Sequence, residues 1–268
     1  MGTSASKNAA QQAALRGKPI ERAGLKLWAI TMNRYEEWAK CKNVWTARQS
    51  KFPVSCISLP FLEALFEMDM QAIDQTGNPK GYVYSILYGL GMALRMKEDC
   101  VRSGDIYLSI DEEKRKFNAI RVKRTGGSEA EITAAQFGAI RKTVLWMNGE
   151  DEPDESENDE LLEAERELAE RNAPRLQYDL MDLEASVALA YRMRISDVMD
   201  WSILEFEACR RAVQREKKHL ICGIGETNGC KWDNGNPYPS WCFDRIKDTS
   251  GALISQSQFG RQKTNKKE

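Results

Sequence analysis

The chain has 268 residues, of which 42% are hydrophobic and 29% are charged, and its formal net charge is −1. This composition can supply one or two cores, whereas every apolar run is broken by charge before the roughly 20 residues that a membrane helix needs. We therefore expect a soluble protein with no membrane span. The polar start of the chain lacks the apolar core of a secretory signal, and the seven cysteines show no repeated spacing. Both features favour reduced thiols in a cytoplasm.

The charge is distributed unevenly along the chain. Between Glu150 and Glu170 there are twelve acidic residues and one basic residue, Arg166, so the remaining residues carry a net charge of about +10. The start of this run offers no side chain suited to a core, and Pro153 interrupts any helix there. This pattern predicts an acidic, disordered linker over 150–175 between two folded parts.

Before the linker, residues 1–19 are predicted to be disordered and residues 20–149 to form a helical module. Apolar residues recur at roughly helical intervals in three stretches, which we predict to be helical: 20–45, 58–73 and 82–97. Gly89 and Gly91 lie in the last of these stretches. We expect these two glycines to let a neighbouring helix approach closely.

The strongest β signal in the chain lies in the same module. Residues 105–110 alternate apolar and polar side chains, and 117–123 follow after a polar connection, which predicts one small β-hairpin. Ser128 and Glu131 have the spacing of a capping box, in which each side chain satisfies the backbone N–H of the other residue. A helix over 132–147 is therefore predicted to follow directly.

Residues 176–219 are predicted to form a second helical module. An apolar stripe lies on its first helix, Ser196 caps a short turn, and Ser202 with Glu205 forms a capping box ahead of the last helix. The stripe consists of Leu183, Val187, Ala190 and Tyr191. Residues 220–268 form a segment rich in Gly, Trp and Pro with a basic tail. The predicted fold class is mainly α, with two small helical modules, an acidic disordered linker and one small β-hairpin in the first module.

The second module carries a resemblance to a known family. It reads Leu183-Glu-Ala, then Ala188-Leu-Ala and Met193, an Asp-bearing turn, and Trp201-Ser-x-x-Glu-Phe before an amphipathic helix. This order resembles the minor-tail-protein module of tailed bacteriophages related to lambda, which follows a helical first domain of similar size. The acidic stretch resembles the junction at which ribosomal frameshifting fuses the two frames in that family. The motifs cover about 183–215, whereas the first 55 residues and those after Lys218 have no counterpart.

The resemblance implies a non-enzymatic tail assembly chaperone that acts in the host cytoplasm. Its first module would hold the tape measure protein and its second would recruit major tail subunits, while self-association of the chain is left open. The side chains expected to contact partners, unless each of them fills the core of its own module, are Phe66, Met70, Trp201, Phe206 and Arg210.

Two other kinds of site are left open by the residues. Imidazole and thiolate ligands suited to tetrahedral zinc are present, although the usual close pair of cysteines is missing, and ordinary thiols are the alternative. These candidate ligands are His219, Cys222, Cys230 and Cys242. The helix over 202–218 is basic, which gives the alternative of a nucleic-acid-associated or packaging protein. Its basic residues are Arg210, Arg211, Arg215, Lys217 and Lys218.

Catalytic patterns are missing from the sequence. It has one histidine and no GxSxG, P-loop or HExxH motif. Neighbouring carboxylates such as Glu67 and Asp69, or Asp182 and Glu184, point apart on a helix, so we interpret them as solvated faces. We therefore expect no enzymatic activity and no cofactor.

Overall fold

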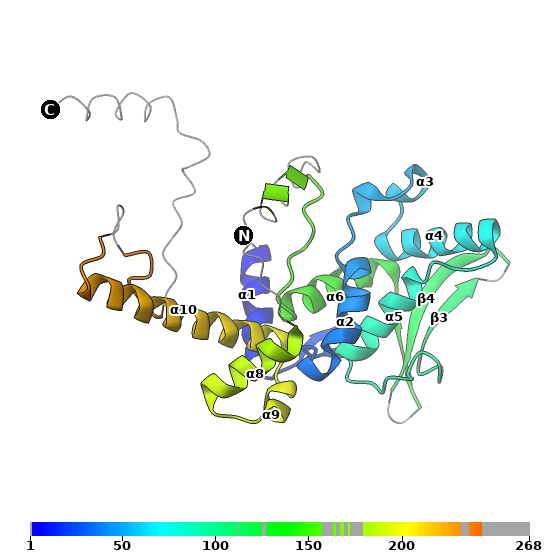
Figure 1. Cartoon of the computed structure of the whole chain (residues 1–268). Helices are drawn as coiled ribbons and strands as arrows, with labels where there is room; N and C mark the ends of the chain where they lie inside the picture. Colours follow the sequence, from blue (N-terminus) through cyan, green and yellow to red (C-terminus); the bar gives the residue numbers. More distant parts are fainter. Residues whose placement is uncertain are drawn as a thin grey trace, which may run out of the picture. The chain divides into compact units, whose positions relative to one another are not determined.

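The computed structural model describes residues 2–111, 113–124, 127–156, 163–164, 167–168, 171, 179–231 and 236–242, with the backbone alone for 2–6. The chain divides into two compact units, Met1–Cys209 and Arg210–Glu268. The elements of the first unit (Figure 1) are α1 Gly2–Leu15, β1 Ile20–Arg22, β2 Leu25–Leu27, η1 Met32–Arg34, α2 Tyr35–Trp45, η2 Gln49–Lys51, α3 Val54–Ile57, α4 Phe61–Thr76, α5 Tyr82–Ala93, β3 Ile106–Asp111, β4 Lys116–Lys123, β5 Glu129–Ile132, α6 Ala134–Met147, α8 Leu180–Tyr191 and α9 Ile195–Met199. Helix α10, Ile203–Thr227, begins in the first unit and continues into the second.

The β structure corrects the predicted fold class. The described part of the chain is predominantly helical, but it holds two small antiparallel sheets where one hairpin was expected. β1 and β2 form a two-stranded sheet, and β3, β4 and β5 form a three-stranded sheet in that order. The expected hairpin is β3 and β4, which pair from Ile106 with Val122 to Asp111 with Lys116.

The third strand explains why the sequence pattern was misleading. Ala130 and Ile132 of β5 are buried while Glu129 and Glu131 are exposed, so the segment alternates between faces as a strand does. The predicted capping box of Ser128 and Glu131 is therefore wrong. Helix α6 begins two residues later with a different box, in which Thr133 Oγ1 accepts from Gln136 N at 3.4 Å and Gln136 Oε1 accepts from Thr133 N at 3.0 Å.

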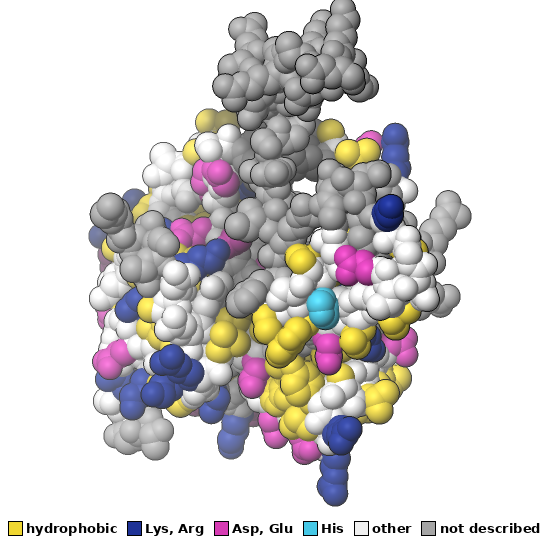
Figure 2. All heavy atoms as spheres, turned by 90° about the vertical axis from the view of Figure 1, so that its left-hand side faces the viewer, with side chains coloured by type: hydrophobic (Ala, Val, Ile, Leu, Met, Phe, Trp, Pro, Cys, Tyr) yellow, Lys and Arg dark blue, Asp and Glu magenta, His cyan; other side chains and the backbone are white. Residues whose placement is uncertain are grey.

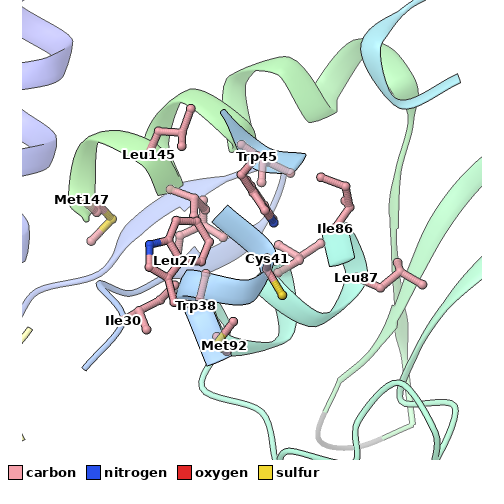
Figure 3. Packing of buried hydrophobic residues seen from close by; sticks show 14 of the residues in the cluster. Leu27, Ile30, Trp38, Cys41, Trp45, Ile86, Leu87, Met92, Leu145 and Met147 are labelled. Carbon is pink, nitrogen blue, oxygen red and sulfur yellow. The ribbon is translucent and has the colours of Figure 1, made fainter. Parts of the chain in front are cut away.

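The core of the first unit lies where α2, α5 and α6 meet the chain that follows β2 (Figure 3). Trp38 and Trp45 lie about two helical turns apart on α2, and both are buried. Their ring centroids are 5.8 Å apart. Trp45 also packs against Phe137 of α6, with ring centroids 5.7 Å apart. Arg141 of α6 closes the end of α2, because its Nε and Nη2 donate to the carbonyls of Trp45 and Ala47 at 2.8 and 2.7 Å.

The two glycines of α5 allow a close approach, to a neighbouring helix at Gly89, as predicted, and to the non-helical chain after α5 at Gly91. A Cβ on Gly89 would lie 2.3 Å from Trp45 Nε1, and a Cβ on Gly91 would lie 2.5 Å from Cys100 Sγ. Real Cβ atoms do not come this near to other heavy atoms. Glycine at position 89 therefore sets the distance between α2 and α5.

A buried carboxylate joins α4 to the start of α5. Asp69 of α4 accepts hydrogen bonds from the backbone N–H groups of Gly81, Tyr82 and Val83 at 2.9, 3.3 and 2.9 Å. The first N–H groups of a helix have no partner inside the helix, so this carboxylate acts as the cap that α5 lacks locally. The prediction that Asp69 belongs to a solvated face was wrong.

The N-terminal segment forms a helix, α1, in a stretch that was predicted to be disordered over 1–19. Helix α1 buries Ala10 and Ala14, and it packs against α6. The hairpin of β1 and β2 follows, with Ala23 and Gly24 both at positive φ (49° and 71°). Two consecutive positive φ values are typical of the tight type I′ turn, whose twist matches that of the strands.

Helices α8 and α9 share the core of the preceding residues, which differs from the separate module predicted over 176–219. The backbone N–H of Met32 donates to the carbonyl of Trp201 at 2.9 Å, and that of Ile203 donates to the carbonyl of Ile30 at 2.9 Å. One continuous hydrophobic cluster contains residues from both predicted modules, including Val187, Ala188, Val198, Leu204 and Phe206. These backbone hydrogen bonds join residues more than 150 positions apart in the sequence, so a local sequence pattern cannot predict them.

The first residues of the acidic run also contact the folded unit. Glu150 pairs with Lys42 at 2.5 Å, Asp151 pairs with Lys7, and Glu152 pairs with Lys142 at 2.7 Å. Both carboxylate oxygens of Glu155 accept from the backbone N–H groups of Gln49 and Ser50 at 2.9 Å. Burial alone would raise the pKa of Glu155, but these backbone hydrogen bonds and Arg141 outweigh it and lower that pKa. Thus residues 150–155 are part of the fold, and most of the remaining predicted linker lies outside the described residues.

The second unit consists of the distal part of α10 and the described residues after it. Arg215 Nη1 donates to the carbonyl of Cys242 at 2.9 Å, and His219 Nδ1 lies 2.8 Å from the carbonyl oxygen of Tyr238. The single histidine of the chain, His219, reaches the surface on the face drawn in Figure 2. Leu220, Ile221 and Ile224 of α10 are among the exposed large hydrophobic residues.

Candidate protein-docking surface

The residues that carry the family resemblance form a compact turn of helices. Asp179 and Asp182 form the capping box that begins α8, with Asp179 Oδ1 accepting from Asp182 N at 2.8 Å. Arg192, at φ 55°, ends the helix in a left-handed conformation. The cap of α9 also differs from the prediction, because the side chain of Asp197, and not of Ser196, accepts from the N–H of Arg194 at 3.2 Å.

One half of the capping box predicted for the last helix is shown by the structure. Ser202 Oγ accepts from the backbone N–H of Glu205 at 3.2 Å, at the start of α10. Ser202 also forms an isolated bridge with Thr31, between the two backbone hydrogen bonds that hold this region to the core. The start of α10 is therefore held both by its own N-cap, Ser202, and by backbone pairing with residues 30–32.

The predicted apolar stripe of α8 is rotated in the structure. Val187 is buried as expected, but Ala190 and Tyr191 are exposed, and their places are taken by Glu184 and Ala188. Leu189 is consequently left 80% exposed on the opposite side. The apolar residues of α8 thus lie on two sides of the helix. Val187 and Ala188 pack into the core, and Leu189 is exposed.

The outward face continues through the turn into α9. It consists of five exposed large hydrophobic side chains, and we call it the α8–α9 apolar face: Met181, Leu189, Tyr191, Met193 and Ile195. Scattered exposed hydrophobic residues are ordinary, whereas five within the fifteen residues of α8, the connection and the start of α9 are typical of an interaction surface. Leu189 and Tyr191 are two residues apart and project from different sides of α8, so this surface extends around the end of the helix. Because the backbone beneath is held by the core, the face is presented in one arrangement, which lowers the entropic cost of binding.

The five residues predicted to contact partners are not brought together. Phe66 and Phe206 are buried in the core, where a partner cannot reach them. Met70 and Trp201 are half-buried and pack against the core cluster, and Trp201 contacts Tyr191 edge to face at 5.6 Å. Trp201 therefore supports the α8–α9 apolar face from beneath. Arg210 is half-buried and belongs to the second unit.

The zinc ligands and the basic helix offer no assembled site. Among the described residues no group of three or more His, Cys, Asp or Glu side chains could hold a metal ion. Cys222 is buried, whereas Cys230 and Cys242 are exposed. On the basic helix, Lys218 lies over the ring of Tyr238 at 5.1 Å. Arg210, Arg211 and Arg215 all have interactions within the chain. These contacts do not favour a continuous cationic surface.

Helix α8 also buries a carboxyl group, that of Glu184, so the prediction that Glu184 belongs to a solvated face was wrong. Glu184 of α8 is 6% exposed and its Oε1 has no hydrogen-bond partner among the described residues. Burial, with Asp179 and Glu36 nearby, raises the pKa of this carboxyl above its ordinary value. Ionised Glu184 is therefore a destabilising feature of the fold at neutral pH.

We expect Glu184→Gln to raise the free energy of unfolding by about 1 kcal/mol at neutral pH, because it removes a buried charge that lacks a partner. Since the folded-state pKa is raised, the wild type gains stability as the pH falls through that pKa, and the advantage of the variant should shrink. Urea unfolding at neutral and mildly acidic pH measures both effects, with Glu226→Gln on the exposed surface of α10 as the control. An advantage that is equal at both pH values would contradict the assignment.

The chain was compared with models of protein families, with curated proteins and with solved structures, and none of them matches it. No helix in the described ranges has both the length and the apolar character needed to cross a membrane. The class of protein is therefore inferred from the surface itself and from the resemblance of residues 183–215.

Proposed function

We propose that this chain is a tail assembly chaperone of a tailed bacteriophage, which acts without catalysis in the host cytoplasm. It would bind the tape measure protein and recruit major tail subunits to it. The observation that carries the proposal is the α8–α9 apolar face, because it is exposed, is held in place by the core and includes Leu189 and Met193, two residues of the motif that resembles this family.

The α8–α9 apolar face is assigned to the major tail subunit, because the resemblance gives this role to the part of the sequence, 176–219, in which the face lies. An assembly factor of this kind needs an apolar surface that can be covered by a partner and released later. Exposed methionines suit such a surface, since their flexible side chains adapt to different partners. Met181 and Met193 supply two of them.

Co-expression tests the proposal. The chain should keep the tape measure protein soluble and should co-purify separately with the major tail protein of the same phage. Failure to co-purify with either tail protein would contradict the proposal. Gene order gives an independent check, because the gene should lie directly before a very long coiled-coil gene, with a slippery heptamer near the codons for 145–155.

A further inference from the structure

A second candidate site lies in the first unit, away from the residues that carry the resemblance. It is an open groove of about 750 Å³ between β2, the chain that follows α5 and the paired ends of β3 and β4. Leu25, Leu94, Met96 and Val122 supply its apolar lining. The groove therefore joins three segments that are distant in the sequence.

The rim of the groove is strongly basic. One carboxylate, that of Asp105, lines it, and Asp105 Oδ2 already accepts from Ser103 Oγ at 2.7 Å. The cationic residues that line it are Lys26, Arg95, Lys97, Lys123 and Arg124. Over the ranges that the structure describes, none of these five cations is paired with a carboxylate. A concave surface lined by one sign of charge concentrates the field and attracts ligands of the opposite sign.

Several of the groove residues are held in position. The guanidinium of Arg95 lies 4.0 Å from the centre of the Trp28 ring, and Arg95 has the left-handed backbone conformation (φ 56°) that non-glycine residues rarely adopt. Arg124 Nη2 donates to the carbonyl of Gly24 at 2.8 Å, and the N–H of Trp28 donates to the carbonyl of Ala93 at 2.7 Å. Two of the five cations, Arg95 and Arg124, are thus held in position before any ligand arrives.

We propose that this groove binds an acidic peptide segment of a partner protein, one in which carboxylates alternate with apolar side chains. The carboxylates pair with the basic rim and the apolar side chains cover the half-buried Leu94 and Met96. Single-stranded nucleic acid fits less well, because bases need an open aromatic ring and Arg95 already covers one face of Trp28. The site goes beyond the proposed chaperone function and does not depend on it.

Fluorescence anisotropy on the full-length chain tests the groove. The probes are a labelled peptide of repeated Glu-Glu-Leu, a Lys-Lys-Leu peptide of the same length and a labelled oligothymidylate. The test variant is Lys26→Glu with Lys123→Glu. The matched control is Lys40→Glu with Lys116→Glu, which changes the net charge equally on exposed residues that do not line the groove. Thermal unfolding confirms that both variants are folded.

The Glu-Glu-Leu peptide should bind the wild type. Its affinity for the groove variant should be about tenfold lower, and its affinity for the control variant should equal that for the wild type. The Lys-Lys-Leu peptide should not bind. No binding of the acidic peptide, or equal weakening by both variants, would overturn the site. Tighter binding of oligothymidylate that depends on the same lysines would overturn the peptide assignment in favour of nucleic acid. Loss of tail-protein binding in the chaperone test would leave this result unaffected.

Discussion

Replacing Leu189 and Met193 together by glutamate should abolish co-purification with the major tail protein while leaving binding of the tape measure protein intact. Each buried aliphatic or methionine side chain contributes roughly 1.5–3 kcal/mol, so the loss of two corresponds to a hundredfold weaker complex or more. The introduced carboxylates add to this loss, because burying a charge without a partner is costly. Affinity purification of tagged wild type and variant, co-expressed with each tail protein in turn, measures the change.

The chain provides a matched control for this variant. Val54 of α3 is 89% exposed and apolar, yet it lies outside the α8–α9 apolar face. Val54→Glu should therefore leave both complexes unchanged. Leu189 is 80% exposed, so its substitution should cost little stability, since surface substitutions usually stay within about 0.5 kcal/mol. Met193 is 38% exposed, so thermal unfolding is used to check that the double variant is folded. The assignment of the face would be contradicted if the double variant lost co-purification with both tail proteins equally. It would also be contradicted if Val54→Glu reduced co-purification with the major tail protein as much as the double variant does.

The second large effect is expected at Gly89. Its Cβ position lies 2.3 Å from Trp45 Nε1, and Trp45 cannot retreat because it is fully buried between Trp38 and Phe137. Trp45 Nε1 also donates to the carbonyl of Ser85 at 3.3 Å. Gly89→Ala should lower the free energy of unfolding by about 3 kcal/mol, the upper end of the usual cost of overpacking.

Gly138 of α6 is the control for Gly89, because nothing lies within 4 Å of its Cβ position. Gly138→Ala should leave the stability unchanged or raise it by about 0.5–1 kcal/mol, since alanine is the better helix former. Urea unfolding followed by circular dichroism compares the two variants. A Gly89→Ala variant as stable as the Gly138→Ala variant would show that α2 and α5 are not as close as the structure places them.

Local signals in the sequence predicted the parts of the fold that local physics decides. Glycines inside the helical pattern of α5 predicted its close contact with α2, and Ser202 ahead of Glu205 predicted the start of α10. Ser128 and Glu131 show the limit of such signals, because the same spacing occurs by chance in a strand. Only the pairing of β5 with β4, from Ile120 with Ile132 to Lys123 with Glu129, distinguishes the two cases.

The sequence could not reveal the features that depend on distant residues. In the sequence, Asp69 and Glu155 look like solvent-exposed carboxylates. A backbone N–H group 12 residues away binds Asp69, and one 106 residues away binds Glu155. The candidate surface was missed for a similar reason. Periodicity predicts which residues of α8 are apolar, whereas only the packing of Val187 and Ala188 into the core shows that Leu189 faces outward. The basic groove likewise joins three segments that no motif connects.

The most direct test of the α8–α9 apolar face is site-specific photocrosslinking within the assembling complex. A benzophenone amino acid at position 189 should form an adduct with the major tail protein after irradiation, and the same group at position 54 should not. The absence of an adduct at position 189, or adducts of equal yield at both positions, would contradict the claim that this face holds the tail subunit.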